Sequence, residues 1–161
     1  MKDQNVLLPL GKLFASLTKQ YIGVLSLKLK HLPFDRYFYP FWLIAKNNNS
    51  ISQQDLADLL DCDKVTAYRI VEYLEQKEVI YRKKSESDRR CHTLVITKKG
   101  EPYIDDIQDA LIATDEIFTE QLPTKSTFLK DIENLGNSIK KEPSRRISLL
   151  YHQVNNENEK H

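Results

Sequence analysis

The chain has 161 residues, of which 40% are hydrophobic and 29% charged, and its formal net charge at pH 7 is +1. No apolar stretch approaches the length of a membrane span and no secretion-type cleavage site follows the first residues, so we expect a cytoplasmic protein. Only 4 residues are glycine, which argues against an all-β fold or a glycine-rich phosphate site and favours a mostly helical fold.

The charges are distributed unevenly along the chain. Between Lys64 and Lys99, ten basic residues stand against five acidic ones, a net charge of +5, so the remaining residues together carry −4. The segment from Glu101 to Leu122 holds seven acidic residues and neither lysine nor arginine. Such a split concentrates positive potential on one part of the surface, and this suggests a nucleic-acid partner.

Two helices are predicted at the start of the chain. Residues 9–31 form the first, which Pro33 ends; its apolar face consists of Leu10, Leu13, Phe14, Leu17, Tyr21, Val24 and Leu25. Asp35 can cap a second helix that runs to about Lys46, in which Pro40 must lie in the first turn or cause a kink.

A helix–turn–helix pattern follows the asparagine-rich loop at residues 47–49. Ser52 begins a short helix, with Asp55 in the position of a capping-box acid. A three-residue turn then leads to Asp63, a good N-cap for a helix over about residues 64–77. The residues expected to lie off the apolar face of that helix are Lys64, Thr66, Tyr68, Arg69, Glu72 and Tyr73.

The periodicity then changes to that of a β-hairpin. Residues 79–82 and 93–96 are short runs rich in β-branched and aromatic residues, and a polar, charged loop joins them. Thr97 can cap the next helix, whose narrow apolar stripe consists of Ile104, Ile107, Leu111, Thr114 and Phe118. Pro123 ends it, and Thr124 can cap a last helix with Phe128, Leu129, Ile132, Leu135 and Ile139 on its apolar face.

This order of elements is that of a winged helix–turn–helix, whose second helix can enter the DNA major groove. An arginine on that helix can bond a guanine or clamp a phosphate, and arginines at the hairpin tip can reach a minor groove. The residues expected at DNA are Ser52, Gln53, Lys64, Val65, Thr66, Tyr68, Arg69, Lys83, Lys84, Asp88, Arg89 and Arg90. We expect the Asp88 carboxylate to hold a neighbouring arginine in place rather than to face a phosphate.

Residues 50–101 resemble the winged helix of the MarR (multiple antibiotic resistance regulator) family. The likeness lies in the helix–turn–helix at residues 56–77, in the D-x-R motif of Asp88 and Arg90, and in the strand-to-helix join at residues 94–100. Two residues depart from the family pattern: Asp61 and Glu78 stand where glycine is usual. We therefore expect the end of the first of the two helices to be capped differently.

The resemblance implies a homodimer that binds a palindromic operator, usually as a repressor that a small phenolic or lipophilic molecule relieves. By carry-over, Arg90 is the wing arginine and Asp88 orients it. Residues 1–34 and 101–154 are predicted to dimerise, 35–100 to bind DNA and 155–161 to be a disordered tail. The dimerisation residues expected are Leu10, Leu13, Leu17, Ile104, Ile107, Leu111, Phe118, Ile132 and Leu135. The alternative function is a winged-helix module for protein–protein interaction without DNA binding.

An aromatic cluster near the second predicted helix has two interpretations, a plain core or the lining of an effector pocket; its candidate pocket residues are Phe34, Tyr37, Phe38, Phe41 and Trp42. Cys62 and Cys91 fit no zinc pattern, and they are either reduced thiols or an oxidant sensor. The four histidines are scattered, so no metal or other cofactor is expected. No catalytic or nucleotide-binding motif is present, so an enzyme is not expected.

Overall fold

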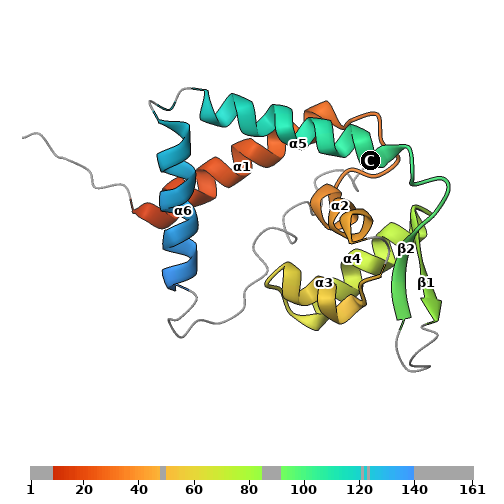
Figure 1. Ribbon diagram of the computed structural model, residues 1–161. Helices are drawn as coiled ribbons and strands as arrows, with labels where there is room; N and C mark the ends of the chain where they lie inside the picture. Colours follow the sequence, from red (N-terminus) through yellow and green to blue (C-terminus); the bar gives the residue numbers. More distant parts are fainter. Residues whose placement is uncertain (1–8, 48–49, 85–91, 121, 123, 140–161) are drawn as a thin grey trace, which may run out of the picture.

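The computed structural model describes residues 9–47, 50–84, 92–120, 122 and 124–139. In this part of the chain there are six helices and one two-stranded antiparallel sheet (Figure 1). In chain order they are α1 (Leu10–Lys28), α2 (Phe38–Lys46), α3 (Gln53–Leu59), α4 (Lys64–Gln76), β1 (Ile80–Lys84), β2 (His92–Ile96), α5 (Tyr103–Thr119) and α6 (Lys125–Ile139). The mostly helical winged helix–turn–helix fold is therefore confirmed.

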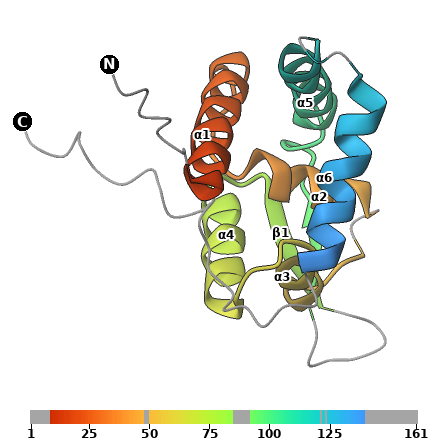
Figure 2. The ribbon, with the colours of Figure 1, turned by 90° about the vertical axis from the view of Figure 1, so that its left-hand side faces the viewer.

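The elements form a winged unit and a set of terminal helices. Helices α2, α3 and α4 pack together with the hairpin, and α5 packs against both α1 and α2 (Figure 1). Helix α6 lies apart from the winged unit, and the view in Figure 2 also separates it from α1. No helix in the described residues is both long and apolar enough to cross a membrane.

One hydrophobic core joins the winged unit to the terminal helices. Its fully buried side chains include Phe41 from α2, Leu56 from α3, Ile70 from α4, Leu94 from β2 and Ile107 from α5. Because these residues come from five elements, the position of the helix–turn–helix is coupled by packing to α5.

The caps predicted for α3 and α4 are confirmed. The hydroxyl of Ser52 accepts a hydrogen bond from the Asp55 backbone N–H at 3.1 Å, and the Ser52 N–H donates to the Asp55 carboxylate at 2.8 Å, which completes a capping box. The Asp63 carboxylate accepts from the Thr66 N–H at 2.7 Å. Each cap fixes the start of a helix because it satisfies backbone donors that have no partner within the helix.

The expectation that α3 would be capped differently without glycine is wrong. Asp61 adopts the left-handed conformation that glycine favours, with φ 50°. The N–H groups of Cys62 and Asp61 donate to the carbonyls of Ala57 and Asp58, at 3.0 and 3.2 Å, and this is a complete Schellman motif. Helix α4 ends in the same way, with Glu78 at φ 60°.

Each strand of the hairpin is one residue longer than predicted: β1 begins one residue later and ends two residues later than the predicted strand, and β2 begins one residue earlier. Ile80 pairs with Ile96, and the pairing continues to Lys84 opposite His92. The segment before α3 also joins this sheet, since the Leu94 N–H donates to the Ile51 carbonyl at 2.8 Å and Ser52 bridges Thr93. The start of α3 and the wing are therefore held directly to one another.

Two predicted caps are wrong. Asp35 does not cap α2, which begins at Phe38, directly after Tyr37 in a left-handed backbone conformation. Pro40 lies in the first turn of α2, which is one of the two arrangements that the sequence allowed for it. Asp35 instead accepts a hydrogen bond from the hydroxyl of Tyr73 at 2.6 Å. The expected first helix likewise ends three residues early, at Lys28.

Thr97 does not cap α5, because α5 begins six residues later. Its hydroxyl accepts from the Gly100 N–H at 3.1 Å and donates to the Glu78 carbonyl at 2.7 Å. The bonds from Tyr103 to Gly100 and from Ile104 to Glu101 span three residues, so a tight turn separates Thr97 from the regular helix.

Candidate nucleic-acid interface

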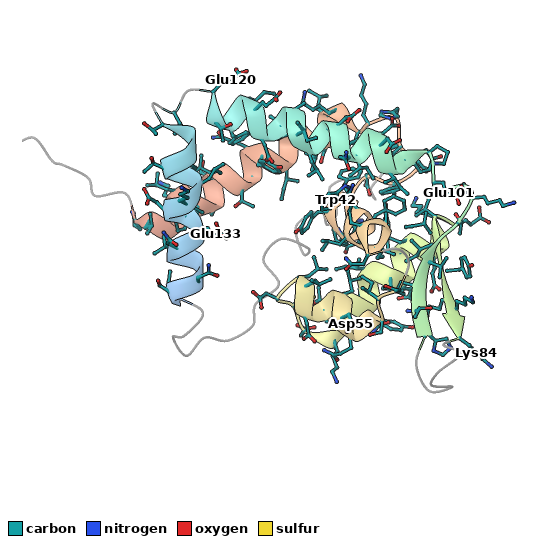
Figure 3. The ribbon with its side chains drawn as sticks, viewed as in Figure 1. Trp42, Asp55, Lys84, Glu101, Glu120 and Glu133 are labelled. Carbon is teal, nitrogen blue, oxygen red and sulfur yellow. The ribbon has the colours of Figure 1, made fainter. Side chains whose placement is uncertain are left out.

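The helix–turn–helix and the wing present polar side chains on one side of the molecule. Figure 3 shows Asp55, in the first turn of α3, and Lys84, at the end of β1, along the same lower edge. Glu101 and Glu120, which flank α5, lie on the opposite, upper side. The lysine-bearing end of the wing strand therefore lies away from the acidic helix, as the charge distribution in the sequence suggests.

The predicted contact residues of α4 are mostly exposed. Lys64, Val65, Tyr68 and Arg69 are accessible on its N-terminal half. Thr66 is buried, with 3% exposure, so the expectation that it lies off the apolar face is wrong. The reason is helical geometry: Thr66 stands four residues before the buried Ile70 and therefore shares its face.

The other predicted contact residues fall into two groups. Ser52 and Gln53 are half-buried at the start of α3. The N-terminus of a helix is a position where backbone N–H groups can bind a phosphate. Lys83 and Lys84 are exposed at the end of β1. The predicted tip residues Asp88, Arg89 and Arg90, together with Cys91, lie outside the described residues.

Arg82 is a residue of this surface that the sequence prediction missed. Its guanidinium forms an ion pair with Glu75 of α4 and donates to the side-chain oxygen of Gln53 in α3 at 3.2 Å. The guanidinium carbon also lies 5.5 Å from the centre of the Tyr68 ring. The two-residue period of β1 could have revealed it, because Arg82 shares the inner face with Ile80.

A second polar cluster lies at the other end of α4. The hydroxyl of Tyr73 bonds Asp35, and the Arg36 guanidinium stacks 4.6 Å from the Tyr73 ring centre. Partial burial, followed by the hydrogen bond to Asp35, raises the pKa of Tyr73 above its ordinary value. This cluster attaches the segment before α2 to the outer side of α4.

The aromatic cluster divides into buried and accessible rings. Phe34, Phe38 and Phe41 are buried in the core, in agreement with the core interpretation. Tyr37 and Trp42 are only partly buried, and Trp42 stacks with Tyr39 at 6.0 Å between ring centres. A role of these five residues in effector binding stays a prediction.

The terminal helices expose apolar side chains. On α1 the predicted dimerisation residues Leu10, Leu13 and Leu17 are 41–58% exposed, and on α6 Ile132 and Leu135 are about as exposed. On α5, Ile104, Leu111 and Phe118 are partly buried. Ile107 is wholly buried within its own chain, so it cannot itself form a contact surface for a second copy.

The described residues contain no cluster of three or more histidine, cysteine, aspartate or glutamate side chains that could hold a metal ion. Cys62 is buried, with 2% exposure, and forms no disulfide bond within the described residues. Because oxidants react with accessible thiolates, the burial of Cys62 argues against direct oxidation at this position.

The comparisons with known proteins point to one family. The model of the MarR family matches residues 43–92. A putative transcriptional regulatory protein for the hcr operon of Thauera aromatica is 32% identical over 84 residues, which are 52% of this chain and 51% of that protein. The transcriptional repressor MprA of Escherichia coli K12 is 34% identical over 65 residues, 40% of this chain and 37% of MprA.

The chain thus matches only about half, or less, of the length of these curated relatives. The fold match extends further. The Staphylococcus aureus MepR structure, solved as a DNA complex, superposes with a TM-score of 0.71 over 82% of this chain and 95% of MepR, at 17% identity. At that identity the superposition shows a shared fold.

Proposed function

We propose, from the match of residues 43–92 to the MarR family model, that the chain is a transcriptional regulator of this family that binds double-stranded DNA as a homodimer. The observation that carries the proposal is the exposed polar surface made jointly by the start of α4 and the end of β1. Lys64, Tyr68 and Arg69 are accessible on α4, and Lys83 and Lys84 on the wing strand. In this arrangement α4 enters the major groove while the wing reaches the adjacent backbone or minor groove.

The start of α3 supports the same placement. The N-terminal end of α3 is accessible at Ser52, Gln53 and Gln54, and it lies beside the wing strand to which residues 51 and 52 are bonded. A helix N-terminus attracts phosphate through its N–H groups and its dipole. We therefore place Ser52 and Gln53 at the DNA backbone, where they set the register of α4 without reading bases.

The experiment that tests the proposal measures the affinity of the chain for duplexes selected from a randomised DNA library, over a range of salt concentrations. Arg69→Ala should weaken binding by about 1–3 kcal/mol if it contacts a base. Lys64→Ala should lower the slope of log affinity against log salt by about 1 if it contacts a phosphate.

Lys130→Ala is the matched control, because Lys130 is an exposed lysine on α6, outside the winged unit. It should change neither quantity. Absence of duplex binding at any salt concentration would overturn the proposal and favour the alternative, a winged-helix module that docks a protein partner. Arg90→Ala belongs to the same series as a prediction from the family resemblance, at a similar cost of about 1–3 kcal/mol.

We propose that the homodimer forms through α1 and α6. Their exposed leucines and isoleucines are a costly surface to leave in water, and a second copy of the same chain would cover them. A dimer would also place two winged units on one duplex, as a palindromic operator requires.

Repression that a small phenolic or lipophilic molecule relieves is a further part of the proposal. Of the five candidate pocket residues, only Tyr37 and Trp42 keep partial exposure, so an effector would contact the cluster there. Trp42 is the only tryptophan of the sequence. Its fluorescence should therefore change when salicylate is added, and the affinity for DNA should fall in parallel. If neither the fluorescence nor the DNA affinity changes, the proposal that an effector relieves repression is wrong.

A further inference from the structure

Arg82 carries an inference that rests on the proposed function and deepens it. We propose that Arg82 and Glu75 form a positioning pair, which orients the DNA-facing side chains of Gln53 and Tyr68 and ties the wing to the helix–turn–helix. In this role Arg82 is not itself a phosphate ligand, although it is a basic residue on the DNA-binding domain.

The pair joins a strand to a helix through two hydrogen bonds. One carboxylate oxygen of Glu75 accepts from the backbone N–H of Arg82 at 3.0 Å, and the other pairs with the Arg82 guanidinium. Both side chains are about three-quarters buried, at 26% and 28% exposure. One bond comes from the backbone N–H of β1 and the other from the guanidinium, so the Glu75 carboxylate holds both the strand and the Arg82 side chain to α4.

The bond to Gln53 decides which end of its amide faces outward. A guanidinium has only donors, so the Gln53 amide must turn its oxygen toward Arg82, as the 3.2 Å contact shows. The amide nitrogen, with two donors, is then left for another partner. A phosphate offers only acceptors, so Arg82 presents Gln53 in the orientation that suits the DNA backbone.

Arg82 also contacts Tyr68, which lies on the α4 part of the same surface. The guanidinium carbon lies 5.5 Å from the centre of the ring, within the range of a cation–π contact. Tyr68 is 49% exposed, so without this contact its ring would have several accessible rotamers. Arg82 thus contacts α3 and α4 while its own backbone belongs to the wing.

An electrostatic role and a positioning role of Glu75 predict opposite changes in DNA affinity when its carboxylate is removed. The removal of a carboxylate from a DNA-binding surface should, by charge alone, strengthen binding, because less repulsion of phosphate remains. If Glu75 holds Arg82 in place, its removal should weaken binding instead. The sign of the effect therefore separates a positioning role from a general electrostatic one.

The test compares Glu75→Gln with Glu72→Gln, using the duplex that the unchanged protein selects from a randomised library. Glu72 is an exposed acid on the same helix and serves as the matched control. Glu75→Gln should lose affinity about tenfold, the size of one lost charge-assisted hydrogen bond, while Glu72→Gln should bind as well as the unchanged protein or better. Equal or tighter binding by Glu75→Gln would overturn the inference.

Arg82→Lys provides the second arm, because lysine keeps the charge but cannot bond Glu75 and Gln53 and stack on Tyr68 at once. It should also lose about tenfold in affinity, with an unchanged slope of log affinity against log salt. Retained affinity in Arg82→Lys would show that only the charge of Arg82 matters, and would overturn the positioning role. Thermal unfolding of each variant verifies that it folds; if one of the two variants does not fold, the other one decides the question by the same criterion.

The two proposals fail in distinguishable ways. If the unchanged protein selects no duplex, the proposed function fails. If the unchanged protein binds and Arg69→Ala weakens binding, but Glu75→Gln and Arg82→Lys do not, only the positioning role fails.

Discussion

Among the described residues, Tyr37, Asp61 and Glu78 occupy the left-handed region of the backbone, with φ of 64°, 50° and 60°. This conformation is unfavourable for residues with a Cβ atom, least so for aspartate and asparagine. Asp61 and Glu78 each complete a Schellman motif, so the hydrogen bonds at the helix end maintain the conformation without glycine.

Asp61 offers a direct test of this strain. Asp61→Gly should raise the free energy of unfolding relative to Asp61→Ala by about 1 kcal/mol, because glycine adopts positive φ without a steric penalty. Both variants remove the same carboxylate, so charge cancels in the comparison. Urea unfolding measures the difference, and equal stability of the two variants would contradict a strained residue at this position.

The partly buried tyrosines Tyr21 and Tyr73 have raised pKa values, which predict a titration at alkaline pH. The pKa of Tyr21 is raised chiefly by burial and then by its hydrogen bond to Asp115, and that of Tyr73 by burial and its bond to Asp35. Because the raised pKa belongs to the folded state, the associated stability is complete below about pH 10 and declines as the pH rises further.

Absorbance titration of the phenolates tests this pKa effect. We expect a phase above the ordinary range of tyrosine, which Tyr73→Phe reduces and Tyr21→Phe reduces separately. In Asp35→Asn the Tyr73 part should move to lower pH, because the neighbouring negative charge is gone. A high-pH phase that both phenylalanine variants leave unchanged would assign it to other residues.

At the scale of elements, most of the helix and strand pattern follows from local rules. The apolar spacing and the caps at Ser52 and Asp63 are local features of the sequence, and the structure has helices where they indicate. A polar residue type does not by itself predict exposure: Thr66 is buried because its helical position lies on the same face as Ile70. Asp35 and Thr97 do not cap the adjacent helices, because each forms a contact between elements, which local patterns do not encode.

Packing between the wing and α5 depends on a close approach at Gly100. A Cβ atom there would lie 2.5 Å from the Val79 carbonyl oxygen and 3.0 Å from the Ile96 side chain. Gly100→Ala should therefore destabilise the fold by about 1–3 kcal/mol through overpacking. Gly23→Ala, in open space within α1, is the control and should stabilise by up to about 1 kcal/mol. Thermal unfolding with equal effects at both positions would contradict this account.

At the scale of the whole molecule, the described chain has a strongly asymmetric surface. The lower edge in Figure 3 carries Lys84 and the start of α3, while acidic residues flank α5 above. The exposed apolar residues of α1 and α6 lie on helices outside the winged unit (Figures 1 and 2). We propose that the first region meets DNA and that the second meets another copy of the chain.

The proposed dimer gives a prediction at this scale. Leu17→Glu and Leu135→Glu should each shift the chain to a monomer at micromolar concentration in sedimentation equilibrium, because a charge would be buried in the interface. Leu59→Glu is the control, since Leu59 is also about half exposed but lies on α3. A monomer before any substitution, or a dimer after both, would rule out this interface.

The sequence by itself determined the order of helices and strands, the helix caps at Ser52 and Asp63, and the basic segment that suggests DNA, because these depend on residue type and short spacing. Only the tertiary structure decided which residues Arg82 contacts, that Asp35 accepts a hydrogen bond from Tyr73 of α4, and that Ile107 is buried within its own chain. Arg82 is separated from Gln53 by twenty-nine residues, and contacts over such distances arise only when the hairpin packs back onto both helices. Local periodicity places a side chain on a face, whereas the packing of other elements determines what that face meets.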